Sequence, residues 1–159
     1  MILIPSSQFL RNEIQNEIGR LPPSFSFLQN KRLYNFQIKL LKKNWKEERI
    51  ILTIPDSYDV QEIDVESIQS YEVEIIRSSS NLSLGEHISE IIENKKPNNL
   101  KILHGDTLFR KLPLEDDIVV VGRPHETAEW DYSDNNKNSN LVWAGFFNFS
   151  KHKIFLYEL

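Results

Sequence analysis

The sequence predicts an α/β fold: a three-layer α/β/α sandwich with a mostly parallel central sheet and a C-terminal β-hairpin. Short apolar runs alternate with amphipathic segments through the first hundred residues, which is typical of a parallel sheet covered on both faces. The 159 residues suit one domain with a real core. No internal repeat or heptad run is visible. We therefore expect one domain over residues 1–159.

The first forty residues predict a strand, a helix, a loop and a second helix. An apolar run at 2–4 predicts the first strand. Across 10–18, leucine and isoleucine recur at intervals of four, which indicates one face of a helix that Gly19 would cap. Residues 21–30 contain two adjacent prolines and are expected to form an extended loop. A second amphipathic helix follows at 33–43 and ends in two lysines, which suit a helix C-terminus.

The same alternation continues through the rest of the chain. Apolar and alternating runs predict strands at 49–54, 71–76, 100–103 and 117–121, with helices near 65–68 and 84–92. Ser83 precedes the second of these helices as a suitable N-cap. Two apolar, aromatic segments at 128–132 and 141–149 flank the polar residues 134–140, and this pattern predicts the C-terminal hairpin.

Composition excludes several functional classes. The net charge of −4 argues against a general nucleic-acid binder, which would show a basic face. The chain has no cysteine, so it has no disulfide framework, zinc–thiolate site or cysteine nucleophile. No apolar run reaches membrane-spanning length, and the N-terminus lacks a signal-peptide pattern. We expect a soluble cytoplasmic protein with no nucleic-acid or membrane partner.

The most informative motif lies where the strand at 100–103 ends in Gly105-Asp106. An apolar run followed by Gly-Asp indicates a buried strand that delivers one carboxylate, through a tight turn, to the carboxyl edge of the sheet. Open α/β sheets bind their ligands at that edge. A carboxylate placed there can hold a divalent metal against the phosphates of a nucleotide. The alternative is a strand followed by an ordinary Gly-Asp turn.

Five segments follow one another in the order of five motifs of a known enzyme family. Residues 21–41 align without a gap to a segment of the form P-K-x-L-L-P-x-x-G-K-P-L-I-x-x-Q-I-x-L-L. Residues 104–108 are similar to N-G-D-T-L, and 142–149 to A-G-I-Y-V-F. The strand at 49–54 and the Leu-Gly pair at 84–85 match two further motifs. The chain therefore resembles a divergent member of the sugar-nucleotidyltransferase superfamily, the GT-A-like nucleotide-diphospho-sugar pyrophosphorylases.

The resemblance implies transfer of a nucleoside monophosphate from a nucleoside triphosphate to a sugar or alcohol phosphate, for surface polysaccharide biosynthesis. Asp106 would hold a magnesium ion, Mg²⁺, and Arg11 would help to neutralise charge, so these two are the catalytic candidates. The nucleotide-binding candidates are Pro5, Ser6, Ser7, Gln8, Gly85 and Gly105. For Arg11 the alternative is a solvated helix residue, and for Gly85 a simple turn at the start of a helix.

Two departures from the family pattern concern the chemistry. The family's first loop reads A-A-G-x-G-x-R, but residues 5–12 contain no glycine, so backbone amides should approach phosphates less closely. The signature lysine falls on Pro23, which carries no charge. One alternative is therefore a catalytically degenerate module that binds a nucleotide or a partner. The other is a small GT-A-type glycosyltransferase, although those usually show Asp-x-Asp where 104–106 reads His-Gly-Asp.

The resemblance also concerns what lies beyond this chain. Family members usually continue past the point that corresponds to residue 159. The single nucleotidyltransferase-like domain is therefore expected to be complete or to be the N-terminal part of a longer protein, with an additional domain or a second copy as a partner.

Weaker candidates each have a simpler explanation. Asp116-Asp117 would form a second carboxylate site or an acidic loop before a strand. Aromatic residues of the hairpin would stack on a base or sugar, or pack across the hairpin. These are Trp130, Tyr132 and Trp143, beside Asp131 and Asp134 as further metal candidates. The four histidines show no metal-ligand spacing.

Overall fold

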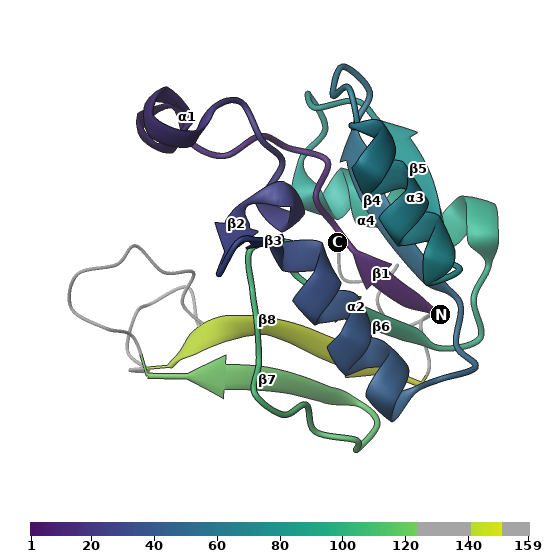
Figure 1. The fold of residues 1–159 in the computed structure, drawn as a ribbon. Helices are drawn as coiled ribbons and strands as arrows, with labels where there is room; N and C mark the ends of the chain where they lie inside the picture. The colour runs from purple at the N-terminus through teal and green to yellow at the C-terminus, as the bar shows by residue number, and fades with distance from the viewer. Residues whose placement is uncertain (124–140, 151–159) are drawn as a thin grey trace.

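The apolar runs of the sequence form the centre of a six-stranded mixed sheet. The computed structural model describes residues 1–123 and 141–150, and its strand order is β5-β4-β1-β6-β8-β7 (Figure 1). Four strands are parallel, namely β1 (Ile2–Ile4), β4 (Ile50–Pro55), β5 (Glu74–Ser78) and β6 (Leu100–Leu103). β8 (Val142–Phe149) is antiparallel to β6, and β7 (Ile118–Gly122) is antiparallel to β8. The expected mostly parallel sheet is confirmed.

Helices cover both faces of this sheet, as the continuous apolar strands predict. α2 (Leu33–Asn44) and α3 (Glu62–Ser70) pack on one face, where Tyr34, Ile38, Leu41 and Ile68 meet alternate residues of β1 and β4. α4 (Leu84–Lys95) covers the other face through Ile88, Ile91 and Ile92. The three-layer sandwich is therefore confirmed. No helix in the described part of the chain is long and apolar enough to cross a bilayer.

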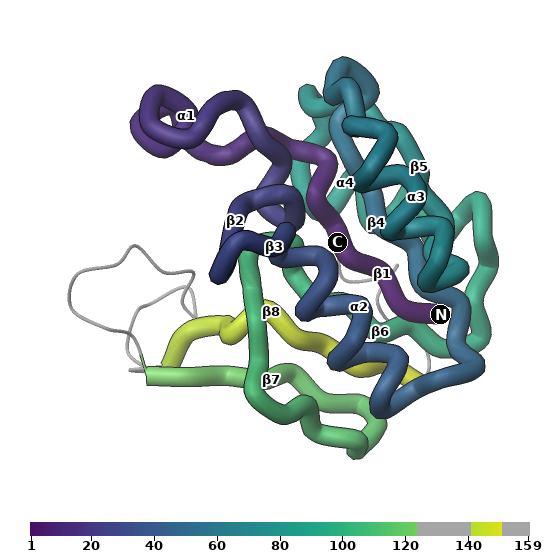
Figure 2. Tube along the Cα trace, in the orientation of Figure 1, coloured from purple at the N-terminus to yellow at the C-terminus, as the bar shows by residue number. Residues whose placement is uncertain are grey.

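Local signals place the helix ends. Ser83 caps α4 in a capping box, in which its hydroxyl accepts from the backbone of Glu86 and the Glu86 carboxylate accepts from the backbone of Ser83. α1 (Asn12–Ile18) ends at Gly19, whose φ of 88° suits glycine. However, α1 buries none of its residues and projects away from the sheet (Figures 1 and 2). The four-residue period indicates a helix, but it does not say what the helix packs against.

Residues 21–30 differ from the expected extended loop. They contain a short 3₁₀ helix, η1 (Pro23–Phe25), and the strand β2 (Phe27–Leu28), which pairs with β3 (Lys31–Arg32). Gln29 and Asn30 join these two strands with φ values of 50° and 62°. Positive φ at both central residues is the geometry that closes a two-residue hairpin.

The strands β5 and β8 match the expected segments to different degrees. β5 begins three residues later than expected, because α3 runs to Ser70 and Glu72 turns with a φ of 56°. At the C-terminal end, β8 corresponds to the expected apolar segment at 141–149 and pairs antiparallel with β7. The other expected arm of the hairpin, 128–132, and its turn, 134–140, lie outside the described residues.

Candidate functional site

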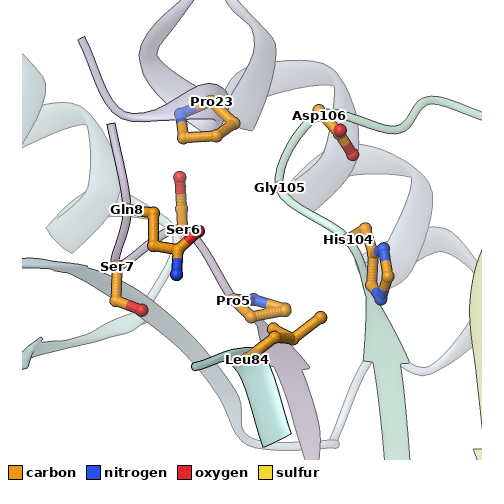
Figure 3. A pocket seen from close by; sticks show the side chains of 9 residues that line it. All are labelled: Pro5, Ser6, Ser7, Gln8, Pro23, Leu84, His104, Gly105 and Asp106. Atoms are coloured by element: carbon orange, nitrogen blue, oxygen red, sulfur yellow. The ribbon is translucent and has the colours of Figure 1, made fainter. Parts of the chain in front are cut away.

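A cavity of about 140 Å³ opens at the carboxyl edge of the sheet, where β1 and β6 end (Figure 3). Its lining comes from the loop after β1, from η1, from the start of α4 and from the turn after β6: Pro5, Ser6, Ser7, Gln8, Pro23, Leu84, His104, Gly105 and Asp106. Small-molecule sites usually measure about 300–1,000 Å³. The cavity therefore suits one part of a larger ligand, such as a phosphate group with its metal ion.

The Gly105-Asp106 turn is packed tightly against the end of β1. The backbone N–H of Gly105 donates to the carbonyl of Pro5 at 3.1 Å, and that of His104 donates to Gly145 at 2.9 Å. A Cβ atom at Gly105 would lie 2.6 Å from the Pro5 carbonyl oxygen and 2.9 Å from Ser24 Oγ. The position therefore needs glycine, because the Pro5 backbone and the Ser24 side chain lie too close for any side chain.

Two side chains hold this turn from the interior. Gln37, on the buried face of α2, donates from Nε2 to the carbonyls of His104, Gly105 and Thr107 at 3.0, 3.1 and 2.8 Å. Ser24 Oγ donates to the same Gly105 carbonyl at 3.1 Å. Sequence reasoning missed both residues. The available signal was a glutamine at an apolar position of an amphipathic helix.

The serine loop after β1 is anchored by hydrogen bonds. The Ser6 N–H donates to Thr53 Oγ1 at 3.0 Å, and Ser6 Oγ accepts from the Ser24 N–H at 3.0 Å. Gln8 Nε2 donates to the carbonyl of Leu82 at 3.1 Å. Ser6 and Ser7 are both buried. The loop therefore has a fixed shape without glycine, and Ser24 connects it to the Gly105 turn.

Among the described residues that line the cavity, Asp106 is the one charged residue. Its carboxylate is exposed, and Thr107 Oγ1 donates to it at 3.0 Å. Arg32 is one of the cations nearest in sequence to Pro23. Its side chain is buried and pairs with Asp64 at 3.2 Å. Its guanidinium also donates to the carbonyl of Phe25 at 2.9 Å, which fixes η1. Arg32 therefore supports the cavity wall and does not bring charge into it.

The structure brings together most of the expected site residues, but not all. The cavity lining contains Pro5, Ser6, Ser7, Gln8, Gly105 and Asp106, and Pro23 lines it at the position of the family lysine. Arg11 is the exposed N-cap of α1 and does not line the cavity. Gly85 also lies outside the lining, in the first turn of α4, while its neighbour Leu84 is part of it.

Asp116 and Asp117 lie far from the cavity. They precede β7 at the opposite edge of the sheet, where Asn148 Nδ2 donates to Asp116 Oδ1 at 3.2 Å and the Ser150 N–H donates to Asp117 Oδ1 at 2.8 Å. The acidic-loop explanation therefore holds for this pair. Trp143 lies on β8 with its ring centroid 6.1 Å from that of Phe147. The other candidates, which are His125, Trp130, Asp131, Tyr132, Asp134 and His152, lie outside the described residues.

The two described histidines occupy different environments. His87 lies on the buried face of α4, and its Nδ1 lies 2.7 Å from Ser78 Oγ. Burial lowers the pKa of this imidazole, and the nearby Glu90 carboxylate opposes that shift. His104 lines the cavity, with its ring centroid 5.5 Å from that of Phe147. His104 is therefore the histidine placed to contact a ligand.

The donor set at Asp106 fits Mg²⁺ bound together with a nucleotide. Within residues 1–123 and 141–150, no three histidine or carboxylate side chains gather into a metal cluster. Mg²⁺ does not require one, because it commonly takes one or two carboxylates, phosphate oxygens of the substrate and several waters. The exposed Asp106 carboxylate would supply one ligand, and the nucleotide would supply the phosphate oxygens.

Comparison with known proteins agrees with this architecture. No protein-family model matches the chain, and no curated protein matches it in sequence. Among solved structures, a nucleoside-diphosphate-sugar pyrophosphorylase from Vibrio cholerae RC9 superposes with a TM-score of 0.66 at 13% identity. The match covers 99% of this chain and 76% of that chain. This chain therefore has a nucleotidyltransferase-like fold.

Proposed function

We propose that this chain binds a nucleotide at the carboxyl-edge cavity through Mg²⁺ held by Asp106. The reaction proposed is transfer of a nucleoside monophosphate from a nucleoside triphosphate to a sugar or alcohol phosphate, with surface polysaccharide biosynthesis as the expected context. One observation carries the proposal: an exposed carboxylate stands on a hydrogen-bonded turn and lines the same cavity as a fixed serine loop. The pyrophosphorylase-like fold supports the same reaction class.

The proposed reaction needs little covalent chemistry from the protein. An acceptor phosphate oxygen attacks the α-phosphorus in line, the bond from that phosphorus to the bridging oxygen breaks, and pyrophosphate leaves. Such transfers depend on positioning and on neutralising charge. Asp106 would hold the ion that neutralises the phosphates, while residues 6–8 would contribute hydroxyl and backbone donors to the phosphate oxygens.

A second candidate, binding without turnover, is favoured by the charge of the cavity. No lysine or arginine is among the described residues that line it, and Pro23 stands where the family carries lysine. Loss of one preorganised donor costs about a hundredfold to a thousandfold in rate. We therefore expect the isolated chain to release pyrophosphate far below the ordinary enzymatic range of about 1–1,000 per second.

The binding step is tested by replacing Asp106 with asparagine. We expect nucleoside triphosphates or nucleotide-diphospho-sugars with Mg²⁺ to raise the melting temperature of the wild-type chain, because a ligand that binds only the native state stabilises it. Asp106→Asn should remain folded by circular dichroism but lose this Mg²⁺-dependent shift. Asp59→Asn, which removes an exposed carboxylate from the loop after β4, is the matched control and should retain it. Equal shifts for wild type and Asp106→Asn would refute the role of Asp106.

Turnover separates the two candidate functions. Pyrophosphate release is measured with the four common triphosphates against a panel of sugar and alcohol phosphates. Turnover in the ordinary enzymatic range would establish the transferase and refute the expectation of low competence. Binding without turnover favours the degenerate module. Transfer of the sugar from a nucleotide-diphospho-sugar to an acceptor would instead identify a glycosyltransferase.

A further inference from the structure

Gln37 has a buried amide that helix packing does not explain. It lies on the core-facing side of α2 with no exposed surface, between the apolar positions Leu33 and Leu41. Its Oε1 atom is buried and has no hydrogen-bond partner among the described residues. A buried acceptor without a partner costs free energy, so an apolar residue would pack here without that penalty. The reason for a glutamine must therefore lie in what its Nε2 group does.

The Nε2 group bonds to both sides of Asp106. Its acceptors are the carbonyl oxygens of His104 and Gly105, which precede Asp106, and of Thr107, which follows it. Two amide hydrogens therefore serve three carbonyls within 3.1 Å. Because the backbone is held before and after Asp106, the direction of the Asp106 Cα–Cβ bond is fixed.

Apart from one backbone bond that closes the turn across Asp106, the other contacts act before Asp106. Pro5, Gly145 and Ser24 bond to groups of His104 or Gly105, before the carboxylate. After it, the Thr107 N–H closes the turn onto the His104 carbonyl at 3.1 Å. Among the described residues, Gln37 is the one side chain that donates to carbonyls both before and after Asp106. We infer that Gln37 is a positioning residue that sets the divalent-ion affinity of Asp106, an inference that rests on the proposed function.

The size of the effect follows from how metal sites behave generally. Residues that orient a metal ligand without touching the metal usually change affinity about 10-fold to 100-fold when they are replaced. Gln37 acts on the backbone beside the ligand, so its removal should let the carboxylate sample several directions. Asp106 would remain exposed and ionisable, but it would be less ready to receive an ion.

Asn148 provides a matched control for a purely structural role. It is also fully buried, its Nδ2 donates to the carbonyl of Glu115 at 2.7 Å, and its Oδ1 has no partner. It holds the loop before β7 at the opposite edge of the sheet. Replacing Asn148 should therefore lower the stability of the fold as Gln37 replacement does, without affecting Asp106.

The experiment compares Gln37→Met, Gln37→Glu and Asn148→Leu with wild type at a temperature where all four are folded. Mn²⁺ binding is followed by water-proton relaxation, and Mg²⁺-dependent binding of a nucleoside triphosphate by calorimetry. We expect both Gln37 variants to bind at least about tenfold more weakly, because methionine and a glutamate carboxylate both lack the two amide hydrogens. Asn148→Leu should stay within about twofold of wild type. Wild-type affinity in either Gln37 variant overturns the inference.

Hydrogen exchange separates failure of this inference from failure of the proposed function. The amides of Gly105 and Thr107 should exchange at least about tenfold faster in Gln37→Met than in wild type, and at the wild-type rate in Asn148→Leu. If wild type binds no divalent ion, the proposed function fails, and the exchange rates still decide whether Gln37 holds the turn. Unchanged exchange in Gln37→Met overturns the positioning role whatever the metal does.

Discussion

The two edges of the central sheet differ in whether their carboxylates are paired with cations of the protein. At the amino edge, Glu48 accepts from the chain's N-terminal ammonium at 2.9 Å and from Lys101 Nζ at 2.6 Å. Glu74 accepts there from Lys95 Nζ at 2.7 Å and from Arg49. At the carboxyl edge, the described lining of the cavity has one carboxylate, the exposed Asp106, among prolines, serines, Gln8, Leu84, His104 and Gly105.

The carboxylates at the amino edge pair with cations of the protein and stabilise the fold, whereas Asp106 is placed to bind a cation from solution. Burial raises the pKa of Glu48, but hydrogen bonds from Lys101 and the N-terminus outweigh it, so the net pKa is lowered. Its charge is therefore already neutralised inside the protein. Asp106 accepts from a threonine hydroxyl instead. In the cavity at the edge where open α/β sheets bind ligands, the described lining therefore offers an incoming cation one carboxylate, that of Asp106.

The largest expected effect comes from breaking the charge compensation at the amino edge. Glu48→Gln leaves the Lys101 ammonium, whose side chain is 4% exposed, without its carboxylate. Removing one partner of a buried ion pair costs about 3 kcal/mol, because the other charge stays buried. We expect urea unfolding to show this loss in the free energy of unfolding, while Mg²⁺-dependent nucleotide binding at the opposite edge is retained.

Arg49→Gln serves as the control for this first prediction. Arg49 pairs with Glu74, but its side chain is 57% exposed, and exposed ion pairs contribute about 0–1 kcal/mol. The two edges would not be independent if Glu48→Gln abolished nucleotide binding in protein that is still folded. An equal loss of unfolding free energy in Glu48→Gln and Arg49→Gln would show that the buried Glu48–Lys101 pair is no more important than the exposed Arg49–Glu74 pair.

A smaller but more local effect is expected at the carboxyl edge. Gly105→Ala places a methyl group 2.6 Å from the Pro5 carbonyl oxygen, so β1 or the Asp106 turn must shift. Overpacking of this kind costs about 1–3 kcal/mol, and it should also weaken Mg²⁺-dependent nucleotide binding. Thermal unfolding and calorimetry measure the two effects. Gly122→Ala is the control, because no atom lies within 4 Å of its new methyl group.

The sequence predicted most of the sheet because the patterns that mark its strands are local. Runs such as 49–54 and 100–103 predict strands buried on both faces, and Ser83 is the expected N-cap of α4. The Gly-Asp turn followed from the same logic. Arg11 does not line the cavity because α1 projects from the sheet, and no local pattern indicates the surface against which a helix packs.

The contacts that support the site could not be predicted from the sequence because they join residues far apart in the chain. Gln37 meets the Asp106 turn across 67 to 70 residues of sequence, and Ser24 meets Gly105 across 81. Arg32 is one of the cations nearest in sequence to Pro23, which stands at the family lysine position. Its burial against Asp64 depends on α3, which lies 30 residues further along the chain. Such pairings follow from the completed sheet and not from residue type or spacing.

The smallest expected effect distinguishes the two edges by pH. His87 lies near the carboxyl end of β5, beside Ser78, and burial lowers its pKa from an ordinary value of 6.5. Below pH 6.5, His87 therefore binds a proton in the unfolded chain but stays neutral in the folded chain until the pH reaches its lowered pKa. Stability must fall as the pH decreases, by at most about 1.4 kcal/mol per pH unit, until the lowered pKa is reached.

The amino edge responds in a different range. The pKa values of Glu48 and Glu74 are lowered from 4.5, so their contribution is complete above that pH and is lost only as the pH falls further. Urea unfolding at pH 7.5, 6.5 and 5.5 should therefore report His87 and not these carboxylates. His87→Asn should flatten the dependence across this range, while the other three histidines stay in place in both proteins. An equal slope in wild type and His87→Asn would assign the titration to another histidine, and the burial of His87 would then have no effect on stability in this range.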